Sequence, residues 1–170
     1  MTTDFTPDHD DILWRDFMKT QPEIIQQDAA FQAAHDGNLW QVQSLLDMGV
    51  PVDAESAEEA GRANKSLLHI AVEKQQHAVA RFLLSRGADA DLPDENVELT
   101  LIKAINNNDP EMLGMLIAAK ADPRQTNEYG ESAIDLAQGR PQLLAILDPA
   151  AATQAPRRSP NGGSPHNKGL

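Results

Sequence analysis

The stretch that decides the fold is residues 66–91, which read SLLHIAVEKQQHAVARFLLSRGADAD. It holds two short apolar runs, LLHIA and VARFLL, which are separated by a polar break. The sequence RGAD follows the second run, and its glycine, Gly87, can take the positive φ that commonly ends a helix. The stretch therefore predicts two short helices that lie back to back and end at a turn.

The same pattern recurs along the chain at a regular spacing. The alanines of the predicted first helices stand 38, 33 and 33 residues apart, at Ala33, Ala71, Ala104 and Ala137. The turn positions after the predicted second helices are Gly49, Gly87 and Lys120, and their spacings are again 38 and 33. A fixed period in this range indicates stacked structural repeats. The five extra residues in the first interval predict an insertion.

These residues and their spacing resemble the ankyrin repeat, a unit of about 33 residues that opens with T-P-L-H-x-A. Residues 68–71, LHIA, match that motif, although Ser66 and Leu67 stand in place of its Thr and Pro. Residues 127–132, NEYGES, resemble the hairpin D-x-x-G-x-T of the family. The resemblance covers residues 28–148. It implies an all-α solenoid of stacked helix-turn-helix units with β-hairpin or turn connections.

We expect one repeat domain flanked by two different ends. The repeats are predicted near 28–53, 66–91, 99–124 and 127–148, with an insertion loop at 54–64 that either binds a partner or is a tolerated surface loop. The N-terminal segment, 1–27, is predicted to hold a capping helix from Ile12 to Lys19, with Asp10 or Asp11 as its N-cap residue. We favour a lid over the first repeat for this helix; an aromatic partner-binding arm is the alternative. The Pro-, Gly- and Ser-rich tail, 149–170, is predicted to be disordered.

The charge of the chain is strongly negative, at −12. The tail contributes three basic side chains and no acid, so residues 1–148 carry 11 basic and 26 acidic side chains, or −15. Such a surface excludes nucleic acid and anionic membranes as partners. The absence of cysteine excludes thiol chemistry. Without a secretory signal or a membrane-spanning apolar run, we expect a cytoplasmic, soluble protein, unless export follows a route that leaves no such signal.

The sequence contains no recognisable catalytic motif. The five histidines lack metal-ligand spacing, GRANKS at Gly61 lacks the second glycine of a Walker motif, and G-x-S-x-G is absent. We therefore predict a protein that is not an enzyme and that needs no cofactor or metal; an unrecognised hydrolase is a remote alternative. His69 occupies the histidine of the repeat motif. We predict a structural role for it, with a hydrogen bond to the backbone of a neighbouring turn.

The family resemblance implies that a partner protein binds the concave face, which the hairpin tips and the first helices form. The residues at the matching positions are Glu58, Glu59, Arg62, Lys65, Glu73, Lys74, Glu95, Asn96, Glu98, Asn106, Asn107, Glu128, Tyr129 and Glu131. We expect a monomer when the protein is free. Its function is then that of a protein-binding module, either a stoichiometric inhibitor, such as a bacterial immunity protein, or an adaptor or scaffold.

Acidic residues gather at the three predicted hairpins. Apart from Glu58 and Glu59, they are Asp53 and Glu55 in the first, Asp89, Asp91, Asp94, Glu95 and Glu98 in the second, and Glu128 and Glu131 in the third. Asp89 matches the family's Gly-Ala-Asp turn and is expected to be structural, as is Asp122. The others predict one negative strip that attracts a basic partner, with Tyr129 as an anchor. A merely solubilising acidic surface is the alternative hypothesis.

Overall fold

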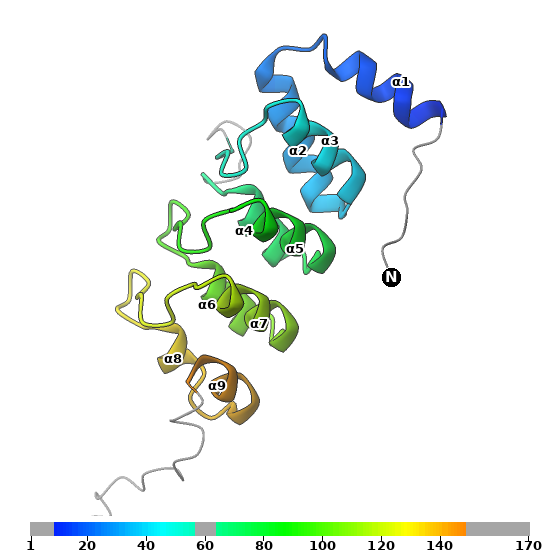
Figure 1. Ribbon diagram of the computed structural model, residues 1–170. Helices are drawn as coiled ribbons and strands as arrows, with labels where there is room; N and C mark the ends of the chain where they lie inside the picture. Colours follow the sequence, from blue (N-terminus) through cyan, green and yellow to red (C-terminus); the bar gives the residue numbers. More distant parts are fainter. Residues whose placement is uncertain (1–8, 57–63, 149–170) are drawn as a thin grey trace, which may run out of the picture.

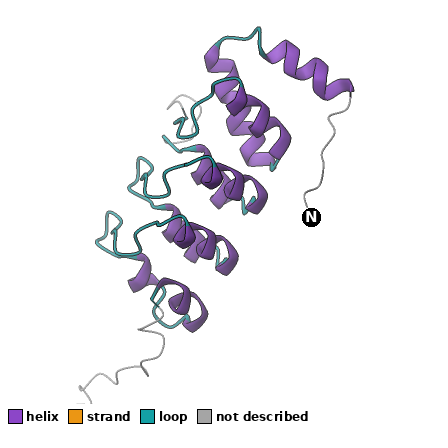
Figure 2. Ribbon diagram, viewed as in Figure 1, coloured by secondary structure: helices purple, strands orange, loops and turns teal. Residues whose placement is uncertain are grey.

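The computed structural model describes residues 9–56 and 64–148. Over these residues the chain forms a stack of helix pairs, and the loops between successive pairs project to one side of the stack (Figure 1). The described part consists of helices and loops without a named strand (Figure 2), because its two antiparallel β-bridges, Glu55 to Ser66 and Thr126 to Ser132, are isolated. The predicted all-α solenoid is confirmed.

Each repeat contributes a first and a second helix. The helices are α1 His9–Met18, α2 Glu23–Asp36, α3 Leu39–Asp47, α4 Leu67–Glu73, α5 His77–Ser85, α6 Thr100–Asn106, α7 Pro110–Ala118, α8 Ala133–Leu136 and α9 Pro141–Leu147. The first helices α2, α4, α6 and α8 pack in one layer, and the second helices α3, α5, α7 and α9 pack in another. Each repeat therefore packs mainly against the repeats next to it along the stack, as in a solenoid.

The core between the two layers is aliphatic. The largest fully buried side chains include Leu45, Leu68, Ile105 and Leu113, with Phe31 as an aromatic exception. The four alanines that set the repeat spacing are also buried. Small side chains at these positions let the first helices of successive repeats approach closely, which explains why the alanine recurs with the period of the repeat.

Local capping explains where several helices begin. The side chain of Ser66 accepts a hydrogen bond from the His69 N–H at the start of α4. Asp109 accepts one from the Met112 N–H at the start of α7, where Pro110 occupies the first turn. Ser132 and Asp135 form a reciprocal capping box at the start of α8. Each cap satisfies backbone donors that the helix leaves free.

Two aspartates join successive loops of the stack. The Asp89 N–H donates to Asp53 Oδ1, and one repeat later the Asp122 N–H donates to Asp91 Oδ1, both at 2.9 Å. Asp53 and Asp91 are 38 residues apart and so hold equivalent positions in their repeats. Our prediction that these two carboxylates are free to meet a partner is wrong, because they accept backbone hydrogen bonds between repeats.

The N-terminal helix differs from its predicted form. α1 begins at His9 rather than Ile12, so Asp10 and Asp11 lie in its first turn, where acidic side chains favour the helix dipole. Met18 is buried, and the Trp14 ring lies 5.4 Å from that of Trp40 in α3. Leu13 and Phe17 are more than half exposed. Trp14 and Met18 therefore pack on the repeats, whereas Leu13 and Phe17 do not.

Two turn positions of the repeat keep a positive φ although different residues occupy them in successive repeats. Lys120 takes a φ of 70° at the position of Gly49 and Gly87, so the turn forms without glycine. Val97 takes a φ of 54° at the position that Gly130 holds in the next repeat. A positive φ is unfavourable for any L-residue and especially for a β-branched one.

Replacing Val97 with glycine should stabilise the protein by about 0.5–1 kcal/mol. The change relieves a left-handed conformation that costs roughly 1–2 kcal/mol, and the greater freedom of glycine in the unfolded chain offsets part of this gain. Little packing is lost, because Val97 is 43% exposed. Urea unfolding measures the effect, with Val97→Ala, which keeps the Cβ atom, as the control. A lower unfolding midpoint for Val97→Gly would contradict the assigned strain.

Candidate partner-binding face

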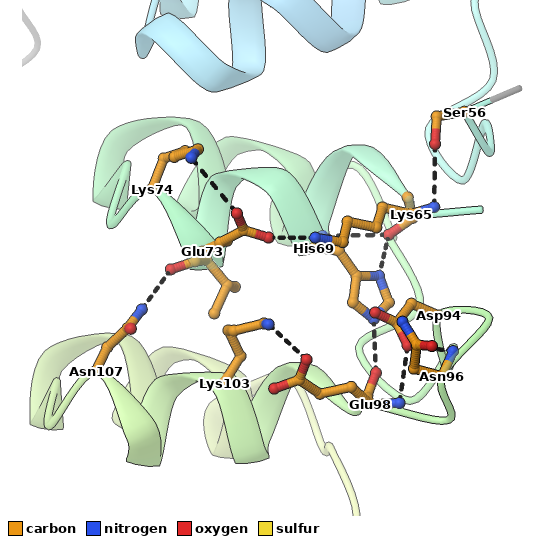
Figure 3. A network of polar contacts seen from close by, with 12 residues as sticks. Ser56, Lys65, His69, Glu73, Lys74, Asp94, Asn96, Glu98, Lys103 and Asn107 are labelled. Atoms are coloured by element: carbon orange, nitrogen blue, oxygen red, sulfur yellow. Dashed lines mark hydrogen bonds and ion pairs between the residues drawn. The ribbon is translucent and has the colours of Figure 1, made fainter. Parts of the chain in front are cut away.

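A polar network covers the first helices of the second and third repeats on the side of the loops (Figure 3). Lys65, just before α4, pairs with Glu73 at the end of that helix at 2.5 Å. Glu98, just before α6, pairs with Lys103 of that helix, also at 2.5 Å. Lys65 and Glu98 hold equivalent positions 33 residues apart. The residue before the first helix is therefore the base of the ion pair in the second repeat and the acid in the third.

The ion pairs place charges of both signs side by side. Burial disfavours the charge of Glu73, but its hydrogen bond with Lys65 and the positive charges of Lys65 and Lys103 outweigh this effect and lower its pKa. Lys74 lies 3.4 Å from the same carboxylate. This part of the face is therefore nearly neutral, and its charged side chains are held by one another.

His69 joins the second repeat to the third. It is 2% exposed, and its Nε2 lies 3.2 Å from the Glu98 carbonyl oxygen, while its Nδ1 lies 2.9 Å from Ser66 Oγ. Since a carbonyl can only accept, Nε2 carries the proton and Nδ1 accepts from the Ser66 hydroxyl. The structural role predicted for His69, with a hydrogen bond to the backbone of the neighbouring turn, agrees with this geometry.

Two further side chains that the sequence analysis predicted to be available to a partner make hydrogen bonds within the protein. Asn107 Nδ2 donates to the Val72 carbonyl at 3.1 Å and so ties the end of α6 to α4. Asp94 is 5% exposed, and its Oδ1 accepts from the N–H groups of Asn96 and Glu98 at 2.9 Å. Our prediction that Asp94 contributes to an exposed negative strip is wrong, because this carboxylate shapes its own loop.

A pocket of about 420 Å³ lies between two loops that are numbered by the repeat they lead into: the third loop, residues 86–99 before α6, and the fourth loop, residues 119–132 before α8. Its lining combines carboxylates, amides, one aromatic ring and two aliphatic side chains: Asn96, Glu98, Ile102, Asn106, Asn127, Glu128, Tyr129, Glu131 and Leu136. Six of these nine are residues that the sequence assigned to the partner-binding face. The fold thus brings residues of three predicted segments to one hollow.

The fourth loop holds Tyr129 at the edge of this pocket. Asn127 Oδ1 accepts from the N–H groups of Tyr129 and Glu131 at 3.0 and 2.9 Å, the same arrangement that Asp94 makes one repeat earlier. Tyr129 is nevertheless 77% exposed. The hydrogen bond between its hydroxyl and Glu128, together with the charge of that carboxylate, raises the pKa of Tyr129. The hydroxyl is thus protonated at neutral pH, and the ring faces solvent.

The structure sorts the fourteen predicted residues into four groups. Asn96, Glu98, Asn106, Glu128, Tyr129 and Glu131 line the pocket, whereas Lys65, Glu73, Lys74 and Asn107 belong to the polar network. Glu95 is exposed on the third loop. Glu58, Glu59 and Arg62 lie outside the described residues.

The sequence did not indicate the two aliphatic residues that line the pocket, nor the lysine that pairs with Glu98 beside it. Ile102 of α6 and Leu136 of α8 line the pocket, but apolar residues on first helices are expected from the sequence to pack in the core. Lys103 pairs with Glu98 across a spacing of five residues, which differs from the three or four that join neighbours on a helix, so the sequence contains no signal for this pair.

Within residues 9–56 and 64–148 no group of three or more His, Cys, Asp or Glu side chains is placed to hold a metal ion. No helix of the described chain has the length and apolar character needed to cross a membrane.

Comparison with known proteins identifies the repeats. A family model for ankyrin repeats in many copies matches residues 83–137, and a model for a single ankyrin repeat matches residues 64–95. The chain is also 28% identical over 102 residues to Protein fem-1 homolog C of Xenopus laevis. That alignment covers 52% of this chain and 16% of the relative, so the chain spans only a small part of that protein.

Proposed function

Residues 64–137 of this chain belong to the ankyrin-repeat family, and from that premise we propose that the protein binds another protein through the face built by its loops and first helices. Ankyrin repeats imply a protein–protein interaction module. The more specific part of the proposal concerns which surface of this protein binds the partner and which charge the partner's surface has.

One observation carries the proposal, namely the pocket between the third and fourth loops with Tyr129 beside it. Tyr129 is 77% exposed and does not belong to the hydrophobic core of the described residues. Tyrosine is enriched among the residues that dominate binding energy at protein interfaces. The carboxylates around it favour a partner with a basic surface.

We further propose that binding inhibits the partner stoichiometrically, as a bacterial immunity protein does; an adaptor or scaffold is the alternative. An inhibitor blocks the partner's own activity at one to one, whereas an adaptor leaves that activity intact. A monomeric state when free and a cytoplasmic location, both predicted from the sequence, remain parts of the proposal. An unrecognised hydrolase is not supported by any arrangement of side chains in the described residues.

Affinity capture from the native cell at low salt, followed by mass spectrometry, tests the proposed face. We expect one protein to be retained by the wild-type chain and by Glu111→Gln, and lost with Tyr129→Ala. Glu111 is the matched control because it is an exposed carboxylate of α7, in the layer of second helices, where it pairs with Arg81. Retention of the same protein by Tyr129→Ala would place the interface elsewhere.

A further inference from the structure

We propose that the pocket between the third and fourth loops accepts an arginine side chain of the partner protein. This inference rests on the proposed function, because it requires that a partner protein binds this face. It adds the chemical class of the group that the pocket recognises. The argument depends on the walls of the pocket, on its uncompensated carboxylates and on the exposed aromatic ring.

The walls suit a long side chain with an apolar stem. Ile102 of α6 and Leu136 of α8 supply aliphatic surface, and the pocket they line has a volume of about 420 Å³. Arginine buries its methylene groups along apolar surface while its charged end stays among polar groups. A purely apolar side chain would leave the carboxylates and amides of the lining without partners.

The carboxylates that line the pocket differ in whether a basic side chain of the protein pairs with them. Lys103 already compensates Glu98 at 2.5 Å. Glu128 contacts the neutral Tyr129 hydroxyl, and Glu131 accepts from the Asn127 side-chain amide at 3.3 Å. In the described residues neither Glu128 nor Glu131 makes an ion pair, and no Lys or Arg lines the pocket. The pocket therefore retains negative charge that a cation of the partner can neutralise.

The exposed ring of Tyr129 favours arginine among the possible cations. A guanidinium is planar, so it stacks on an aromatic face and at the same time donates paired hydrogen bonds to a carboxylate. The ammonium of lysine is a compact point charge that is more strongly hydrated, and it gains less from this arrangement. A metal ion is a poorer fit, because the described carboxylates do not converge as a ligand set.

The test uses N-acetyl-L-arginine amide as the probe and N-acetyl-L-citrulline amide as its neutral analogue of the same shape. We expect the arginine probe to shift the backbone amide signals of Asn96, Tyr129 and Glu131 in heteronuclear NMR spectra, in a saturable way. Citrulline and lysine analogues should bind more weakly. Glu131→Gln and Tyr129→Ala should each weaken the arginine probe about two- to fivefold, and Glu111→Gln should leave its affinity unchanged.

The arginine assignment is overturned if citrulline or lysine binds as tightly as arginine, if Glu111→Gln weakens the probe as much as Glu131→Gln, or if no signal of the pocket shifts. Failure here is distinct from failure of the proposed function. A captured partner whose retention depends on Tyr129, together with a probe that ignores the pocket, refutes only the arginine site. Retention that is independent of Tyr129 refutes the proposed face, whatever the probe does.

Discussion

Replacing His69 with alanine should lower the free energy of unfolding by about 1–3 kcal/mol, the cost of leaving a buried hydrogen-bonding partner unsatisfied. The imidazole links Ser66 of its own repeat to the Glu98 carbonyl of the next one, and it is 2% exposed. Alanine is too small to fill the space of the imidazole, and it cannot form either of the two hydrogen bonds. The interface between the second and third repeats should therefore lose much of its specific stabilisation.

Equilibrium unfolding in urea measures this loss, with His35→Ala as the control. The side chain of His35 is half exposed and pairs only with its neighbour Asp36 in the described structure. The control should change stability by less than about 0.5 kcal/mol, as surface substitutions usually do. Partner affinity per folded molecule should survive His69→Ala. An unchanged unfolding midpoint combined with lost binding would show that His69 acts in recognition instead.

The same histidine should make stability depend on pH. Burial lowers the pKa of His69, and this effect outweighs the hydrogen bond to the Glu98 carbonyl and the nearby Asp94 charge, which favour the protonated form. The unfolded chain then takes up the proton at a higher pH than the folded chain does. The stabilisation is complete above the ordinary pKa of about 6.5 and is lost as the pH falls below it and through the lower, folded-state pKa.

The difference in stability between the wild type and His69→Ala should accordingly shrink as the pH falls from one unit above the ordinary histidine pKa to one unit below it. Urea unfolding of both proteins at each pH measures this difference. A gap that stays constant or widens on acidification would contradict the assigned burial and tautomer of His69.

Much of the fold is predictable because it is encoded locally and repeated. The 33-residue spacing, the Asp109–Pro110 start of α7 and the turn at Gly87 are each visible in the sequence, and each forms as expected. Lys120 departs from the glycine pattern, yet its turn forms, because packing of the neighbouring helices imposes a positive φ that the residue alone disfavours.

The candidate site was predictable only in part, because the sequence does not show which acids the backbone uses. Asp53, Asp91 and Asp94 look like exposed loop carboxylates, but they accept hydrogen bonds from backbone N–H groups. The bonds to Asp53 and Asp91 join loops whose contact depends on the stacking of repeats, whereas the bonds to Asp94 lie within its own loop. Ile102 and Leu136 were invisible as pocket walls for a related reason, since an apolar residue on a first helix reads as core.

The second large effect concerns the partner. Because Glu95, Glu128 and Glu131 stay exposed after the structural acids are set aside, association with a basic protein surface should be electrostatically steered. Such steering raises association rates by roughly 10- to 1000-fold and is screened by salt. Tyr129→Ala should in addition weaken binding by more than about 1 kcal/mol, the usual threshold for an energetically important interface residue.

The association rate of the captured partner, measured by stopped-flow fluorescence from low to physiological salt, tests the proposed face most directly. It should fall at least about tenfold across this range for the wild type. Glu95→Lys should slow association much more than Glu111→Lys, which makes the same charge change on the layer of second helices. A rate that does not depend on salt, together with full affinity after Tyr129→Ala and Glu95→Lys, would show that the partner binds another face.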